Sequence, residues 1–419
     1  MNDSKRHIPL ITDQHTEEAA FLWLLRDGGA VSDPHYSLKD LTELDNRVDA
    51  HLDGLRIAGE VGWEICLKAL EIGEPGEVFA ASVLAFESGN GQRIDAVLGT
   101  GLANEENFRA LISAIGWIDY KQISPLIRHM LVAKSSDFRR VGIAASAVHR
   151  QDPGQILQHA IESDDALMSA RALKAAGELK RKDLLPAFAK PFNSEDETCR
   201  FWAAWSAVLL GDRLQAKEAL KQTVTSESQF RDRALQMVLR TMDGKEAQSW
   251  LKGLAQNPDW LRDVVVGAGV SGDPAFIPWL IQQMEIPELA RVAGEAFSMI
   301  TGVDLAYEDM EGEMPEGFEA GPTENPEDED VEMDADEDLP WPAPELIQAW
   351  WEKNRPNFQI GARYLAGQPI SAAQCKKVLI SGFQRQRNAA ALEFALIDPR
   401  APLFPTKAPG FVQQRLLGI

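Results

Sequence analysis

One stretch of the chain has the spacing of a nucleotide-binding loop. Gly267, Gly269 and Gly272 match the G-x-G-x-x-G fingerprint, in which glycines let the backbone approach a pyrophosphate, and the apolar run Val264 to Val266 precedes them. The fingerprint needs a strand before it and a helix after it in a βαβ unit, and no such pattern surrounds these glycines. We therefore interpret them as close-packing positions of a helical repeat and expect no cofactor.

The seven histidines lack the spacing of a metal-binding motif. His15 and Glu18 stand one helical turn apart and could join Asp53 in a polar site between the first two helices. The alternative is a hydrogen-bonded pair that fixes a helical cap. No G-x-S-x-G nucleophile elbow is present. We expect no catalytic residue and no metal site, and a protein that is not an enzyme.

The cysteines predict no redox or metal chemistry. Cys66, Cys199 and Cys375 are far apart, odd in number and free of any C-x-x-C pair. We expect reduced, mostly buried thiols.

The charge of the chain is concentrated in one acidic segment. The formal net charge is −22, and Glu308 to Asp338 contains 16 Asp and Glu with no Lys or Arg. Pro315, Pro322 and Pro326 lie within it and oppose a long helix. The segment is either a solvated, mobile insertion or a polyanion that docks on a basic partner. The candidate partner-binding residues are Asp328, Asp330, Glu332, Asp334, Asp336, Asp338, Trp341, Trp350 and Trp351, the tryptophans serving as anchors.

The same charge excludes some partners. Proteins that bind nucleic acid or anionic lipid carry basic patches, so we expect neither a nucleic acid nor a membrane partner. Residues Met1 to Thr12 hold no apolar run long enough for a signal peptide. The expected location is the cytoplasm, and the expected partner is a basic protein.

An arginine recurs through the middle of the chain at spacings of 31, 31, 29, 31, 31 and 29 residues. We call this set the arginine ladder: Arg109, Arg140, Arg171, Arg200, Arg231, Arg262 and Arg291. A fixed period of this length is typical of a repeat architecture. An acid stands three residues before five of the seven arginines, so we expect the ladder to pair with acids of the same or adjacent helices.

Apolar columns accompany the ladder. The position eight residues after each arginine is apolar in all seven units, and the position four residues after it is small or apolar in six. Residues four apart share one face of a helix, so Ala144, Ala175 and Ala204 should be buried where helices cross. Partner helices are expected at Gln155 to Ile161, Leu184 to Phe188 and Ala275 to Gln282.

These units resemble HEAT repeats, whose second helix opens with D-x-x-R-x-x-A. Asp137 to Arg140 and Asp259 to Arg262 match its first half. The resemblance covers roughly residues 100 to 300 and implies an all-α, HEAT-like α-solenoid, a superhelix of helix pairs that binds other proteins.

The ends of the chain carry a narrower resemblance. The blocks His15 to Trp23, His51 to Arg56, Trp350 to Asn354, Phe358 to Leu365 and Arg385 to Ala391 are similar to a proteobacterial HEAT-repeat family of unassigned biochemistry. Members of that family often lie in type VI secretion gene clusters, close to spike proteins and effector toxins. The resemblance implies a place in that system and brings no catalytic motif.

Four segments and three functions are therefore predicted. The segments are an N-terminal helical cap (1–75), a HEAT-like array (76–302), an acidic insertion (303–340) and a C-terminal helical cap (341–419). The first function is a cytoplasmic immunity protein that neutralises a basic effector toxin such as a nuclease. The alternatives are an adaptor or chaperone that loads an effector on the secretion spike, and a HEAT-like enzyme of the lyase or glycosylase kind.

Overall fold

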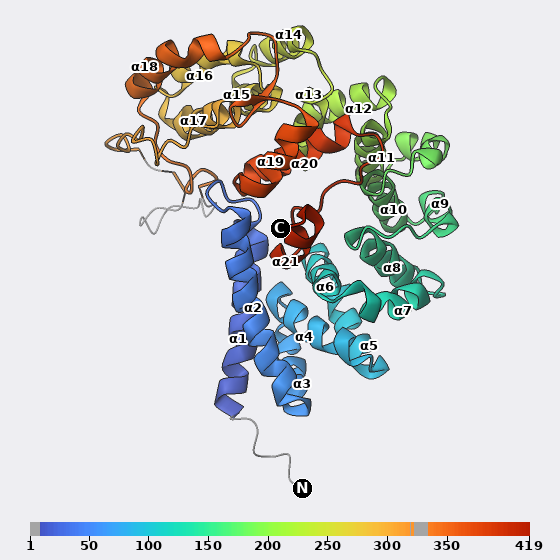
Figure 1. The fold of residues 1–419 in the computed structure, drawn as a ribbon. Coiled ribbons are helices and arrows are strands. Elements are labelled where there is room, and N and C mark those ends of the chain that lie inside the picture. Colours follow the sequence, from blue (N-terminus) through green and yellow to red (C-terminus); the bar gives the residue numbers. More distant parts are fainter. Residues whose placement is uncertain (1–8, 319, 322–333) are drawn as a thin grey trace. The chain divides into compact units, whose positions relative to one another are not determined.

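The computed structural model describes residues 9–318, 320–321 and 334–419, and these residues are mostly helical (Figure 1). The described strands form a single two-stranded antiparallel ribbon, Tyr364–Leu365 (β1) with Gln368–Pro369 (β2). The all-α class predicted from the sequence is confirmed. None of the helices in the described parts has the length and apolar character that crossing a bilayer requires.

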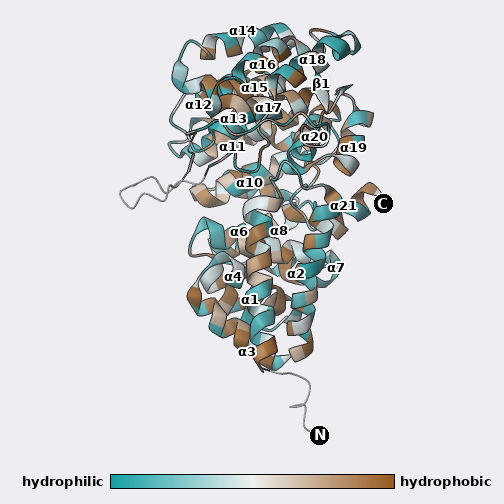
Figure 2. Cartoon of the chain, turned by 90° about the vertical axis from the view of Figure 1, so that its left-hand side faces the viewer, coloured by the Kyte–Doolittle hydropathy of each residue, from teal (hydrophilic) through white to brown (hydrophobic). Residues whose placement is uncertain are grey.

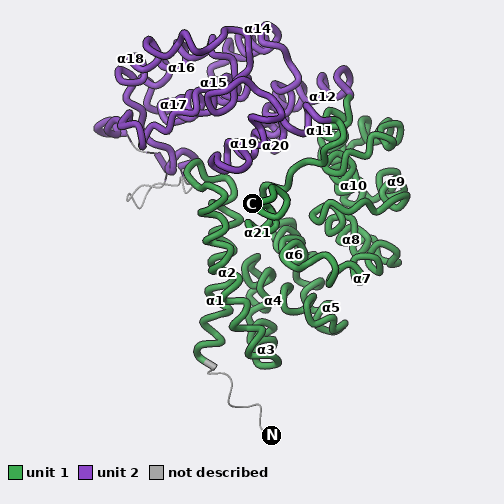
Figure 3. Tube along the Cα trace, in the orientation of Figure 1, with its two compact units in different colours: residues 1–211, 399–419 green, residues 212–398 purple. Residues whose placement is uncertain are grey.

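The chain forms two compact units (Figure 3). The first unit comprises residues 1–211 together with 399–419, and the second comprises residues 212–398. This division differs from the four segments expected from the sequence, because the final residues join the first unit and the array is divided after Gly211.

The α-helices of the first unit are α1 (Pro9–Leu25), α2 (Leu38–Ala58), α3 (Glu60–Ala69), α4 (Pro75–Ser88), α5 (Gly91–Gly101), α6 (Glu105–Trp117), α7 (Tyr120–Leu131), α8 (Ser136–Val148), α9 (Gln155–Ile161), α10 (Ala166–Glu178), α11 (Glu197–Leu210) and α21 (Gly410–Leu417). A π-helical turn, Arg26–Ala30, follows α1, and 3-10 helices include Lys182–Ala189.

The α-helices of the second unit are α12 (Gln215–Val224), α13 (Arg231–Leu239), α14 (Gly244–Leu254), α15 (Leu261–Ser271), α16 (Ile277–Gln283), α17 (Pro287–Thr301), α18 (Pro344–Asn354), α19 (Ala372–Ser381) and α20 (Gln384–Ile397). The ribbon β1–β2 lies between α18 and α19 in the sequence.

Each ladder arginine lies in a separate helix, and a partner helix separates it from the next. The ladder helices are α6, α8, α10, α11, α13, α15 and α17. The partner helix predicted at Gln155 to Ile161 is α9 with the same bounds. The one predicted at Leu184 to Phe188 is a 3-10 helix that contains Pro186, which cannot donate an α-helical hydrogen bond.

The repeat is also visible in how the ladder helices begin and end. Side chains that accept the first free backbone N–H groups cap α6, α8, α10 and α11: Asn104, Ser135, Asp165 and Asp196. Left-handed residues follow five of the ladder helices at a similar period: Arg150, Lys180, Gly211, Gly272 and Gly302. Glycine is the usual residue there. Where Arg150 and Lys180 replace it, their side chains donate to the carbonyls of Leu403 and Leu209, at 2.7 and 2.6 Å.

The small-residue column lies where ladder helices meet. Ala144, Ala175 and Ala204 are buried, and the α8–α10 and α10–α11 pairs are in contact, as the sequence predicted. The approach of α10 to α11 is so close that a Cβ on Gly177 would lie 2.9 Å from the Cα of Ser206. The small side chains at this crossing therefore allow α10 and α11 to approach closely.

In the first unit, the C-terminal segment docks on a buried ion pair. Arg26, in the π-helical turn after α1, binds Asp45 of α2, and both side chains are buried. Arg26 also donates to the carbonyl of Ala408 at 2.9 Å, and Asp45 accepts the N–H of Gly410 at 2.6 Å. A Cβ on Gly410 would lie 2.8 Å from the Cα of Thr42, so only glycine fits this contact.

We predict that Ala175→Leu destabilises the first unit. Adding three carbons at a filled crossing forces side chains and backbone apart, which costs about 1 to 3 kcal/mol. Chemical unfolding measures the change, with Ala189→Leu, at an exposed position of the same unit, as the control. Equal unfolding free energies for the two variants would contradict the packing assigned to this column.

Candidate partner-binding site

Two acids of the acidic segment bind the last two rungs of the arginine ladder. Asp336 accepts two hydrogen bonds from Arg262, each 2.6 Å long, in a bidentate pair. Asp334 accepts one from Arg291 at 2.5 Å. Bidentate guanidinium–carboxylate pairs are among the stronger and more directional polar contacts in proteins. This end of the acidic segment is thus bound to α15 and α17, which corrects the expectation of a mobile insertion for these residues.

Arg291 is enclosed by aromatic rings as well as by oxygen atoms. Its guanidinium lies 4.9 Å from the ring centroid of Trp341 and 5.9 Å from that of Phe318. It also donates to the backbone carbonyl of Asp336 at 2.9 Å. The side chain is buried, so its charge depends on these contacts for compensation.

The electrostatics of Asp334 agree with this arrangement. Burial acts to raise the pKa of the Asp334 carboxyl, but the N–H of Asp336 and the guanidinium of Arg291 outweigh it, so that the pKa lies below its ordinary value. Asp334 therefore remains charged at neutral pH and neutralises Arg291.

The other predicted anchor residues have different environments. Trp351 is buried and Trp350 half-buried, and their rings pack 5.5 Å from those of Phe358 and Phe297 respectively. Trp351 therefore belongs to the core of the second unit and offers no exposed ring to a partner, whereas an anchoring role for the half-buried Trp350 stays a prediction.

The remaining predicted residues give no common site. Trp341 is half-buried against Arg291, and Asp338 is exposed. Asp328, Asp330 and Glu332 lie outside the described residues. The described members of the predicted set therefore do not share one exposed surface, since Asp336 and Trp351 are buried.

A second part of the acidic segment forms an ordered turn that the sequence analysis missed. Leu305 and Met310 are buried in the same core as α17 and α18. Met310 accepts the N–H of Ala343 at 2.8 Å, and Gly312 donates to the carbonyl of Trp341 at 2.8 Å. These contacts hold the residues between them in place.

The turn presents one aromatic residue among carboxylates. Tyr307 is 83% exposed. The exposed acids around it in sequence are Glu308, Asp309, Glu311, Glu313 and Glu316. We call Tyr307 and these five acids the acidic turn. A single aromatic residue in an acidic run, flanked by apolar residues at 305 and 310, is the signal that could have identified it.

Most other rungs of the ladder pair as the sequence predicted. The pairs are Arg140 with Glu105 (3.2 Å), Arg171 with Glu178 (3.2 Å) and Arg231 with Asp263 (3.7 Å), and Arg109 pairs with Asp27 after α1 (3.2 Å). Arg200 differs, because it donates to the backbone carbonyls of Ser194 and Glu195, both at 2.7 Å. The Arg171 pair lies within α10 and the other pairs join neighbouring elements, so these rungs belong to the scaffold.

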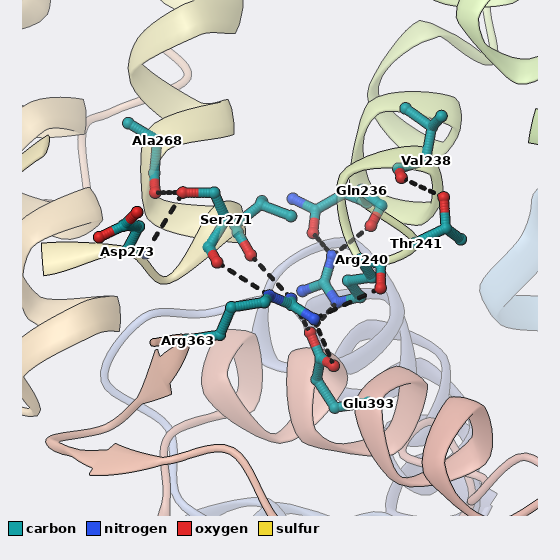
Figure 4. A network of polar contacts seen from close by, with 10 residues as sticks. Gln236, Val238, Arg240, Thr241, Ala268, Ser271, Asp273, Arg363 and Glu393 are labelled. Atoms are coloured by element: carbon teal, nitrogen blue, oxygen red, sulfur yellow. Dashed lines mark hydrogen bonds and ion pairs between the residues drawn. The ribbon is translucent and has the colours of Figure 1, made fainter. Parts of the chain in front are cut away.

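The second unit contains a buried network centred on Glu393 of α20 (Figure 4). Its carboxylate accepts from Arg363 at 2.5 Å and lies 3.3 Å from the Nε of Arg240. Arg363 also donates to the carbonyl of Ser271 at 2.9 Å, and Arg240 to the side chain of Gln236 at 2.7 Å. Burial lowers the pKa of Arg240 to about 10.

This network fastens the ribbon and α20 to the ends of α13 and α15. Beside it, the buried Asp273 accepts the N–H of Gly361 at 3.0 Å, and Tyr364 donates its N–H to Gly272 at 2.8 Å. The block Phe358 to Leu365, on which the family resemblance partly rests, therefore has a structural use here.

The glycines of the apparent nucleotide-binding fingerprint are close-packing positions. Gly267 and Gly269 lie within α15, and a Cβ on Gly269 would lie 2.9 Å from the Cα of Ala296 in α17. Gly272 ends the helix with a φ of +71°. The loop-to-helix geometry of a dinucleotide site is not formed by these residues.

His15 pairs with a different residue from the one expected. Its Nδ1 lies 3.1 Å from the Nδ1 of His51, so one ring donates and the other accepts. Burial lowers the pKa of His51, as does the neighbouring His15, while Glu18 acts in the opposite direction. Asp53 is bound to Arg56 at 2.7 Å instead of joining the histidines.

The described residues contain no exposed cysteine thiol and no cluster of metal-binding side chains. Burial raises the pKa of Cys66 and Cys375 to about 12 and that of Cys199 to about 11. All three are buried free thiols, as predicted. Within the described ranges, no group of three or more His, Cys, Asp or Glu side chains is arranged to hold a metal ion.

A shallow hollow of about 480 Å³ lies between α12 and α14. Its lining includes Trp250, Leu254 and the ion-paired Lys221 and Glu246. Glu246 also binds Lys217, so the charges at this hollow are satisfied internally.

Neither protein-family models nor curated proteins contain a match to this chain.

We predict that Asp334→Asn destabilises the second unit by about 1.5 to 3 kcal/mol at pH 7, the range for hydrogen bonds to charged groups. The folded-state pKa of Asp334 is depressed, so its stabilisation is present above the unfolded pKa and is lost as pH falls through the folded pKa. The difference in unfolding free energy between wild type and variant should therefore shrink as pH falls below about 4. A difference independent of pH would contradict the assignment; Glu316→Gln, at an exposed acid, is the control.

We also predict a larger effect for Glu393→Gln. The variant leaves Arg240 and Arg363 without a carboxylate in a buried site, which costs about 3 to 5 kcal/mol. Urea unfolding measures it against Glu352→Gln, an exposed position on α18. A loss below about 1 kcal/mol, the usual value for a surface pair, would show that the network is not a fastening point.

Proposed function

We propose that this chain is a protein-binding α-solenoid of HEAT-like helix pairs that holds a basic protein partner. Ladder helices contact their successors in each unit: α6, α8, α10 and α11 in the first, and α13, α15 and α17 in the second. Stacked helix pairs of this kind bury a continuous core and offer extended binding surfaces. The repeated caps and left-handed helix ends support the same architecture.

The acidic turn is the observation that carries the proposal. It combines an aromatic residue of the type enriched in interface hot spots with five exposed carboxylates. Because Leu305 and Met310 are held in the core, Tyr307, Glu308 and Asp309 between them lose little conformational entropy when a partner binds. Opposite charge on a partner would speed encounter, and the tyrosine would supply apolar contact after docking.

The narrower proposal is a cytoplasmic immunity protein in a type VI secretion context that neutralises a basic effector toxin. The net charge of −22 supports it, and the resemblance of the chain ends described under the sequence implies the same setting. A nuclease is one suitable target, since its substrate-binding surface is made for a polyanion. An adaptor that loads the effector on the spike would use the same surface with a shorter residence time.

Affinity capture from the native cell, followed by mass identification of the copurifying protein, tests the proposal. The expected result is that one basic protein copurifies with this chain, and that this protein is toxic alone but not when this chain is bound to it. A stable basic partner with unaffected toxicity would favour the adaptor, and an acidic partner would refute the proposed charge complementarity.

We predict that the combined substitutions Glu311→Gln, Glu313→Gln and Glu316→Gln slow association with the captured partner by roughly tenfold at low salt. The screening length at physiological ionic strength is about 8 Å, so the difference should fade as salt increases. Stopped-flow association rates across a salt series measure both effects. These substitutions leave Asp334 and Asp336 in place, so the contacts of Arg262 and Arg291 are preserved.

The matched control neutralises three exposed acids of the first unit: Glu64→Gln, Glu71→Gln and Asp95→Asn. It changes the net charge equally but leaves the acidic turn intact. Equal slowing by both variants would assign the effect to net charge and remove the acidic turn from the interface.

A further inference from the structure

The first helix of the chain exposes apolar side chains on the face directed away from its neighbours. Helix α1 packs against α2, α3 and α4. On its outer side, Phe21 is 61% exposed, Leu24 40% and Leu25 44%. We call these three residues the α1 patch. The helix faces the viewer in Figure 2, where its ribbon carries both apolar and polar stretches.

The opposite face of α1 is apolar as well. Ala19, Ala20, Leu22 and Trp23 are buried against the neighbouring helices. The last two turns of α1, from Ala19 to Leu25, contain apolar residues only, and a helix that is apolar all round is ordinarily enclosed on all sides. The terminal element of a repeat stack usually shows a polar outer face instead. The α1 patch therefore has the composition of a covered surface.

The charge beside the patch distinguishes between possible occupants. Asp13 and Glu17 are exposed and Glu18 is half-exposed on the same helix, which contains no Lys or Arg. Two copies of α1 packed together would bring six carboxylates into one interface, and like charges at contact are unfavourable. An anionic lipid surface would be repelled in the same way. A partner helix with apolar residues on one side and basic residues beside them would be attracted by the carboxylates of α1.

We propose that the α1 patch is a docking site for a basic amphipathic helix of a protein partner. Apolar side chains spaced at i, i+3, i+4 and i+7 on the partner would cover Phe21, Leu24 and Leu25. A Lys or Arg one turn away would pair with Glu17, which precedes Phe21 by one turn of α1. This site belongs to the first unit, whereas the acidic turn belongs to the second.

Two synthetic helical peptides test the proposal on the full chain. Both have leucines at i, i+3, i+4 and i+7; one carries lysines at its polar positions and the other glutamates. The lysine peptide should bind, and the glutamate peptide should bind at least tenfold more weakly. Phe21→Ala should raise the dissociation constant of the lysine peptide roughly tenfold, as truncation of an interface anchor does. Fluorescence anisotropy measures the constants.

Tyr307→Ala is the matched control, since it removes an exposed aromatic from the acidic turn. It should leave lysine-peptide binding unchanged. Loss of binding in Tyr307→Ala with none in Phe21→Ala would overturn the docking site while supporting the proposed function. Equal binding by wild type and both variants would overturn it as well.

Two further measurements exclude the other occupants. Light scattering should give the same mass for wild type and Phe21→Ala. If wild type is a dimer and Phe21→Ala is a monomer, the occupant of the α1 patch is a second copy of this chain and not a partner helix. Sedimentation with phosphatidylcholine vesicles should recover neither protein. If wild type sediments with the vesicles and Phe21→Ala does not, the occupant of the α1 patch is a lipid surface and not a partner helix. Circular dichroism should give the same spectrum and melting curve for both, because Phe21 is largely exposed.

Discussion

Every helix leaves carbonyl oxygens at its C-terminal end without partners in its own turn. In this chain, side chains and backbone N–H groups from outside the helix donate hydrogen bonds to many of these carbonyls. His149 reaches Ile115, Lys180 reaches Leu209, and Leu403 donates its N–H to Glu178. In the second unit, Arg363 and the ribbon do the same for α13, α15 and α17. The helices of each unit are thus joined at their ends as well as through apolar faces.

The guanidinium groups of the arginine ladder also need partners, because they carry charge between packed helices. A guanidinium can lie between packed helices only when carboxylates or carbonyls surround it. Rungs such as Arg171 find a carboxylate on their own helix, whereas Arg262 and Arg291 take theirs from the acidic segment. Part of the acidity therefore stabilises the second unit. The exposed carboxylates of the acidic turn are available for the proposed partner.

The sequence predicted features that depend on local spacing. The ladder, the alanine column and the bounds of α9 could be predicted because each depends on residues within one helical turn or one repeat. The partners of Arg262 and Arg291 were not, since they lie 74 and 43 residues away. The burial of Trp351 depends on how α18 is rotated against α16. Tyr307 follows no periodic pattern, because the order of its turn depends on the burial of Leu305 and Met310 in the core.

The docking of residues 399–419 on α1 and α2 has a consequence for synthesis. Asp45 and Gly410 are 365 residues apart. At a translation rate of about 5 to 20 residues per second, the Arg26–Asp45 pair waits roughly 20 to 70 seconds for its backbone partners to leave the ribosome. During that interval the nascent first unit shows an incomplete polar surface on which chaperones can act. Closure of that surface marks a chain that has been translated through to Gly410.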